Sequence, residues 1–207
     1  MFAKIKKLLV GNLFTAALVI FTLLMLFSPD TKSFVSQGLM KLGFFKPNLE
    51  KPKEAEEIAV ADNIENTLTN NRPAVYFIDN KGVEVDAANL NGKVVFMNFW
   101  ATWCPPCIAE MPSIVKLHDK FKDNENVVFL FVDVDNQMIS AEQFMVKRKF
   151  NLPVHVALGQ IPGEWLGNSI PTTVILDKQG NIAAKHEGMA DYSRKEVVDF
   201  INNLLAE

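Results

Sequence analysis

Residues 94–112 read VVFMNFWATWCPPCIAEMP, and this stretch decides which fold the chain can adopt. Its first seven residues, Val94 to Trp100, form a short apolar run of the kind found in buried strands. A helix is predicted from Pro105 to Phe121, because apolar residues recur there along one stripe and proline is favoured at a first helical position. Cys104 and Cys107 therefore lie where a buried strand passes into a helix.

Strands and helices are predicted on both sides of this stretch. The elements are a hairpin over residues 74–85, strands over 94–100 and 127–132, helices over 105–121 and 140–150, a hairpin over 172–186 and a closing helix over 193–205. Strand, helix, strand, helix implies a parallel βαβ unit. The order of elements is thus βαβ followed by ββα, with residues 152–167 between the halves adding a short strand and a helical turn.

Composition and charge exclude one broad class of function. The chain has 207 residues, of which 49% are hydrophobic and 22% charged, as is ordinary for a globular domain with extensions. Its formal net charge of −3 carries no basic excess that would recruit nucleic acid.

The N-terminus predicts a membrane anchor. Three lysines within the basic segment of residues 1–7 precede an apolar run over residues 8–27, and a helix of that length spans about 30 Å, the thickness of a bilayer core. No small-residue cleavage site follows, so we expect an uncleaved anchor rather than a signal peptide. The positive-inside rule keeps residues 1–7 in the cytoplasm. The expected location is a single pass through the inner (cytoplasmic) membrane, with the C-terminal domain periplasmic or otherwise extracytoplasmic.

Residues 28–72 are predicted to join this anchor to a folded domain over residues 73–207. In the first part, apolar residues recur at roughly helical spacing among lysines. That pattern fits either a short amphipathic helix on the membrane surface or a weakly ordered stalk. From Lys46 to about Arg72 the chain is rich in proline, glutamate, lysine and asparagine, which favours a flexible tether.

The two cysteines are the only ones in the chain, so a framework of structural disulfides is impossible. A cysteine at a helix N-terminus has a lowered pKa and reacts as a thiolate, which favours Cys104 as the attacking group. Cys107, one turn further on, can close a disulfide with Cys104 or release a mixed disulfide. The same two thiolates could instead hold Cu(I) in a metal chaperone, although no histidine lies near the motif to serve as a third ligand.

Two further features of the motif bear on redox chemistry. Glu110 follows Cys107 by three residues, hence on the same helical face, where it could take the proton of Cys107 or simply be a solvated helix residue. Pro105 and Pro106 offer no N–H to a Cys104 thiolate, so the reduced form is less stabilised, which favours a reductant over a strong oxidant.

The stretch Asn98–Pro112 resembles the TlpA/ResA-like family of thioredoxin-fold proteins, with a C-x-x-C-x-x-E pattern ending at Glu110. The resemblance covers residues 73–207 and includes Ile170-Pro171-Thr172-Thr173, which is similar to the family's cis-proline loop. It implies an α/β thioredoxin fold around a mixed central sheet, with an added N-terminal β-hairpin and a central insertion. The family's usual topology also includes one N-terminal transmembrane helix.

The resemblance implies roles for particular residues. Cys104 and Cys107 would form the redox-active disulfide, and Glu110 would be the proton carrier. The substrate would contact Trp103, Pro105, Ile170 and Pro171. Many thioredoxins carry a buried aspartate six residues before the first cysteine, whereas this chain has Asn98 there, so Glu110 is the only nearby carboxylate left for proton transfer.

The resemblance also implies partners. The expected activity is reduction of disulfides in exported proteins, with no cofactor and no metal. Compatible clients include apocytochrome c, which would connect the protein with cytochrome c maturation. Electrons would come from a membrane donor of the DsbD/CcdA type.

Overall fold

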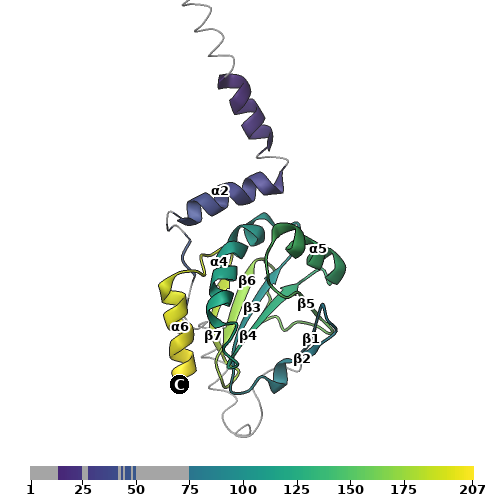
Figure 1. Cartoon of the computed structure of the whole chain (residues 1–207), viewed down its shortest axis with the longest axis vertical. Helices are drawn as coiled ribbons and strands as arrows, with labels where there is room; N and C mark the ends of the chain where they lie inside the picture. The colour runs from purple at the N-terminus through teal and green to yellow at the C-terminus, as the bar shows by residue number, and fades with distance from the viewer. Residues whose placement is uncertain (1–13, 25–27, 42, 44, 48, 50–74) are drawn as a thin grey trace, which may run out of the picture.

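The computed structural model describes residues 14–24, 28–41, 43, 45–47, 49 and 75–207 (Figure 1). Its centre is one mixed sheet of seven strands in the order β2-β1-β5-β4-β3-β6-β7. The strands are β1 (Tyr76–Asp79), β2 (Glu84–Asp86), β3 (Val94–Trp100), β4 (Val127–Asp133), β5 (His155–Ala157), β6 (Thr172–Leu176) and β7 (Ile182–Glu187). Strands β3, β4 and β5 run parallel, whereas β1 and β2, β1 and β5, β3 and β6, and β6 and β7 pair antiparallel. The expected thioredoxin-like α/β architecture with a mixed sheet is therefore confirmed.

Three helices cover one face of the sheet, namely α4 (Pro105–Phe121), α5 (Met138–Arg148) and α6 (Lys195–Ala206) (Figure 1). Strand β4 lies beside β3, and β5 lies beside β4 in the same direction, so two right-handed crossovers place α4 and α5 on the same side. The opposite face packs on a second cluster that includes Phe77 of β1 and Trp165.

Strand β3 determines which side chains meet α4. All seven of its residues are buried, and side chains alternate between the two faces. Phe96 and Trp100 belong to the cluster under the helices, whereas Val95 and Met97 belong to the opposite one. By the same alternation Asn98 points toward α4, which puts a polar side chain beneath that helix.

Helix α5 begins earlier than the sequence indicated. The predicted start was Ser140 with a side-chain cap, but the helix starts at Met138, and Gln137 at the N-cap position makes no side-chain cap bond. Instead Asp133 at the end of β4 accepts a hydrogen bond from the Gln137 N–H at 2.7 Å. A carboxylate four residues upstream thus binds the N–H of the N-cap residue, and the predicted cap at Ser140 is wrong.

The segment before the domain is in part helical and packed. Helix α2 (Pro29–Lys41) contacts α4 and lies across its upper end in Figure 1, and it buries Met40 while leaving Phe34 exposed. Further along, the carbonyl of Phe45 accepts a hydrogen bond from the Asp191 N–H at 3.1 Å. This segment was predicted to be either an amphipathic helix or a weakly ordered stalk, and the structure shows a helix. The predicted tether lies outside the described residues from residue 50 to Arg72.

The predicted anchor over residues 8–27 lies partly outside the described residues. Its residues 14–24 are helical, with large apolar side chains such as Phe14 and Leu18 exposed. Within the parts of the chain that the structure describes, no helix has both the length and the apolar character needed to cross a bilayer.

Candidate active site

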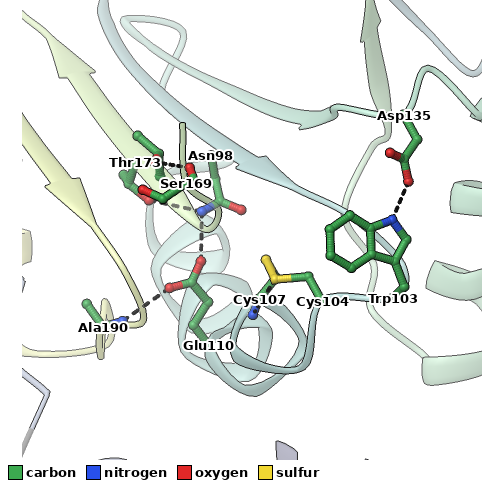
Figure 2. The surroundings of a disulfide bond; sticks show 10 residues. Asn98, Trp103, Cys104, Cys107, Glu110, Asp135, Ser169, Thr173 and Ala190 are labelled. Carbon is green, nitrogen blue, oxygen red and sulfur yellow. Dashed lines mark hydrogen bonds between the residues drawn. A yellow bond between two sulfur atoms is a disulfide. The ribbon is translucent and has the colours of Figure 1, made fainter. Parts of the chain in front are cut away.

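A disulfide between Cys104 and Cys107 lies at the start of α4, where the chain leaves the carboxyl end of β3 (Figure 2). Cys104 has extended backbone angles and is the N-cap residue, and its Sγ accepts a hydrogen bond from the Cys107 N–H at 3.3 Å. Pro105 and Pro106 occupy the first helical positions and have no N–H to add. The Cys107 N–H is thus the main-chain donor that the helix start provides to Cys104.

Trp103 is the exposed neighbour of two buried cysteines. Its side chain is 60% exposed, whereas Cys104 is 2% exposed and Cys107 is completely buried. The indole Nε1–H donates to Oδ2 of Asp135 at 2.6 Å, which holds the ring beside the disulfide (Figure 2). Asp135 was not predicted from the sequence. The available signal was its place just after β4, because neighbouring parallel strands end at the same edge of a sheet.

Glu110 is fully buried one turn after Cys107, which rules out the alternative that it is a solvated helix residue. Its Oε1 accepts from Asn98 Nδ2 at 2.8 Å and its Oε2 from the Ala190 N–H at 3.1 Å (Figure 2). Burial in a medium that disfavours charge raises the pKa of Glu110 from 4.5 to about 8, and the two hydrogen bonds offset only part of that effect. A carboxyl with this pKa can accept and return a proton near neutral pH.

The polar groups around Glu110 come from three parts of the fold, namely β3, β6 and the segment between β7 and α6. Asn98 of β3 also donates from Nδ2 to Thr173 Oγ1 of β6 at 2.9 Å, and these two residues are cross-strand partners. Tyr192, in the segment between β7 and α6, is buried, and both burial and the neighbouring Glu110 charge raise its pKa well above 10. The sequence identified Asn98 but not Thr173, Ala190 or Tyr192, because the last two reach Glu110 only through the return of the chain after β7.

The Ile170–Pro171 peptide bond is cis, as the resemblance implied. The Pro171 carbonyl accepts from the Gly188 N–H at 2.8 Å, so β7 holds this loop in place. Among the described residues, neither main-chain group of Ile170 has a hydrogen-bond partner. Thr173, two residues after Pro171, connects this loop to Asn98 and hence to Glu110.

The mixed sheet, the disulfide at a helix start and the buried carboxyl define a thioredoxin-fold protein with a redox dithiol. The Redoxin family model matches residues 67–200. The thiol-disulfide oxidoreductase ResA of Bacillus cereus is 32% identical over 126 residues, which are 60% of this chain and 72% of that protein. ResA of Halalkalibacterium halodurans is 30% identical over 132 residues, which are 62% and 74%. The chain belongs to the Redoxin family, in its TlpA/ResA-like branch, and is a thiol-disulfide oxidoreductase.

Solved structures agree on the fold. The thioredoxin domain of a thiol-disulfide oxidoreductase from Bacteroides vulgatus superposes with a TM-score of 0.52 at 24% identity, covering 66% of this chain and 100% of that one.

The Cu(I) chaperone alternative has no support. A thiolate pair needs a further soft ligand for such a role. Among the residues that the structure describes, no three histidine, cysteine or acidic side chains come together as a metal site. The relatives named above are oxidoreductases.

Replacing Asp135 with alanine is expected to free the Trp103 ring, because the indole N–H loses its acceptor. The measurement is time-resolved tryptophan fluorescence anisotropy. The chain has three tryptophans, and Trp100 and Trp165 are buried, so added fast motion is assigned to Trp103. The matched control is Asp119→Ala at an exposed site on α4. An Asp135→Ala decay identical to that of the wild type and the control would show that the bond does not hold the ring.

Proposed function

We propose that this oxidoreductase reduces disulfides of exported proteins, with Glu110 moving the proton that the cycle requires. The observation that carries this proposal is the burial of Glu110 one turn after Cys107, with a pKa of about 8. That value is close to the ordinary cysteine pKa of about 8.5, so a proton can pass between the two groups in either direction.

The proposed cycle consists of two thiol-disulfide exchange steps. The Cys104 thiolate attacks one sulfur of a substrate disulfide, forming a mixed disulfide and expelling the first substrate thiolate. Cys107 then loses its proton to the Glu110 carboxylate, and its sulfur attacks Cys104. The bond between Cys104 and the substrate breaks, the second substrate thiolate leaves and takes up a proton, and two electrons have passed to the substrate. A dithiol donor in the membrane, of the DsbD/CcdA type, would reduce the Cys104–Cys107 disulfide again.

The substrate surface would combine Trp103 and Pro105 with the loop of Ile170 and Pro171. The support is that Trp103 is exposed beside the disulfide and that the main chain of Ile170 has no partner among the described residues. An extended segment of an oxidised protein can pair with such free main-chain groups, as in other cases of strand addition. Recognition through backbone leaves room for many clients, apocytochrome c among them.

The small number of hydrogen-bond donors near the Cys104 sulfur supports a role as a reductant. A strong oxidant owes its potential to a stabilised thiolate in the reduced form. Here Pro105 and Pro106 bring no N–H groups, and the Cys107 N–H is the donor at the helix start.

The proposed location is the extracytoplasmic side of the inner membrane, with residues 8–27 as a single-pass anchor and residues 73–207 as the catalytic domain. Supporting this, residues 14–24 form a helix whose large apolar side chains face outward. Within the domain, we regard the pair β1–β2, which forms the outer edge of the sheet beyond β5, as an addition to the thioredoxin core.

The Glu110→Gln variant tests the proton step, because it keeps the shape and removes the base. In the wild type, resolution of a mixed disulfide should speed up as pH rises toward about 8, where Glu110 becomes ionised, and then level off. At pH 7 the variant should be slower by about 10²-fold, and the defect should shrink at high pH, where Cys107 ionises unaided. Stopped-flow reduction of a model disulfide measures this. Glu84→Gln, exposed on β2, is the control, and a wild-type profile in Glu110→Gln would refute the role of Glu110.

The direction of electron transfer is tested by measuring the reduction potential of the Cys104–Cys107 pair in equilibrium with glutathione. We expect a potential nearer the ~−270 mV of thioredoxin than the ~−120 mV of the strong periplasmic oxidants. Pro106→His should move the potential toward the oxidants, because a cationic imidazole beside Cys104 stabilises its thiolate. A wild-type potential at the oxidising end contradicts the proposal.

Topology is tested with a reporter fused after residue 70. The expected result is activity from a reporter that works only outside the cytoplasm, because the basic N-terminal segment stays inside. Activity from a cytoplasmic reporter alone at the same position would reverse the proposed orientation.

A further inference from the structure

The hydrogen bonds around Glu110 suit only one of its two protonation states. Both carboxyl oxygens receive hydrogen atoms, Oε1 from Asn98 Nδ2 and Oε2 from the Ala190 N–H. The second hydrogen of Asn98 Nδ2 goes to Thr173 Oγ1, so the amide nitrogen has donated both of its hydrogens. Such an arrangement serves an ionised carboxylate.

The protonated state needs an acceptor that this arrangement does not provide. A hydrogen on Oε1 would face the NH₂ group of Asn98, donor against donor. Three buried side-chain oxygens in the described part of the chain have no hydrogen-bond partner, namely Oδ1 of Asn98, Oδ1 of Asp133 and the hydroxyl of Tyr192. Asp133 lies at the end of β4 and contacts Gln137 through its other oxygen, which leaves Asn98 and Tyr192 to consider. A buried polar atom without a hydrogen-bond partner is unfavourable, so an unpaired oxygen close to the carboxyl is a suitable acceptor for the acid hydrogen of Glu110. Asn98 Oδ1 belongs to the side chain that already contacts Oε1.

We propose that the Asn98 amide reverses end for end when Glu110 takes up a proton, so that Asn98 and Thr173 act as positioning residues for both protonation states. After reversal, Asn98 Oδ1 accepts the hydrogen of the Glu110 carboxylic acid. The same oxygen has a second lone pair, which accepts the hydrogen of the Thr173 hydroxyl. Thr173 thereby changes from acceptor to donor by rotation about one bond.

The geometry makes this exchange local. Asn98 and Thr173 are cross-strand partners on β3 and β6, so the backbone holds both side chains over α4 (Figure 2). Amide oxygen and nitrogen occupy equivalent places about the same carbon, so reversal needs no backbone motion. An ionised aspartate in place of Asn98 could only accept hydrogen bonds, and a valine in place of Thr173 could neither donate nor accept them. The chain therefore has at both positions a side chain that can donate and accept.

The other groups around Glu110 do not change charge when it takes up a proton, so we assign the response to Asn98 and Thr173. From α4, Ser113 donates to the Glu110 main-chain carbonyl at 2.7 Å. From the segment after β7, Ala190 can only donate, and Tyr192 has its pKa raised well above 10, so it stays neutral. No charged side chain among the described residues shifts the pKa of Glu110, whose causes are burial and the bonds from Asn98 and Ala190.

The test follows the Asn98 side-chain amide by NMR in the oxidised full-length protein in detergent micelles, with labelled asparagine, as pH is raised through about 8. Above the Glu110 midpoint, the Asn98 NH₂ hydrogens should show nuclear Overhauser contacts to Thr173, and below it those contacts should disappear. The amide shifts should share the midpoint of the Glu110 carboxyl carbon. Contacts that persist unchanged through the Glu110 titration overturn the proposal.

Variants identify the acceptor. Asn98→Leu should raise the Glu110 midpoint by about one pH unit or more, a tenfold change in the ionised fraction at fixed pH, because a bond to the charged form is lost. Thr173→Val keeps the shape and should abolish the pH dependence of the contacts. Tyr192→Phe removes the other unpaired oxygen and should leave the reversal of the amide in place. If Tyr192→Phe instead abolishes the amide's titration, the proton goes to Tyr192 and the proposal is wrong.

This inference rests on the proposed role of Glu110, but the two can fail separately. The amide is observed without substrate or turnover. If the amide reverses as expected but Glu110→Gln has wild-type kinetics, the reversal stands and Glu110 is not the base. If the amide stays fixed while Glu110→Gln shows the predicted kinetic defect, Glu110 is the base and the proposed reversal is wrong.

Discussion

The burial of one carboxyl group, Glu110, is the constraint on which the active site depends. A fully buried carboxylate is unfavourable by about 1.4 kcal/mol for each pH unit that its pKa rises, so the shift from 4.5 to about 8 corresponds to a few kcal/mol against ionisation. The fold tolerates this because a neutral acid is stable there and because Asn98 and Ala190 stand ready for the charged form. A group that is costly to ionise but has its hydrogen bonds in place can exchange a proton near neutral pH.

That constraint depends on the central sheet. Strand β3 delivers the chain to Cys104 and turns Asn98 toward α4, while β6 brings Thr173 alongside and the return after β7 brings Ala190. The disulfide, Glu110 and the loop of Pro171 therefore meet at one edge of the sheet. Their supports are central strands rather than mobile loops, which limits how far the reacting groups can drift.

The groups proposed to face the substrate and the group proposed to carry the proton differ in burial. Trp103 is held at the surface by Asp135, whereas Glu110 and both cysteines are enclosed. In the proposed cycle the substrate would meet an apolar ring and free backbone, and water is kept from the carboxyl whose pKa depends on that exclusion. Helix α2 adds a further cover across α4, from a segment whose helical pattern was weak enough to allow a stalk as well.

The sequence by itself determined the local elements with strong patterns. The bounds predicted for β3 and for α4 agree with the structure, because a buried apolar run and a proline-started amphipathic stripe are encoded within a few residues. The motif also identified Cys104, Cys107, Glu110 and Asn98. The predicted start of α5 was wrong, because the residue before its first turn, Gln137, is held by Asp133, which lies outside the helix. Thr173, Ala190, Tyr192 and Asp135 lie from 32 to 82 residues away from the side chains they serve. Only the tertiary structure decided their roles, because a hydrogen bond and the burial that shifts a pKa depend on distance in space, and residue spacing along the chain does not encode that distance.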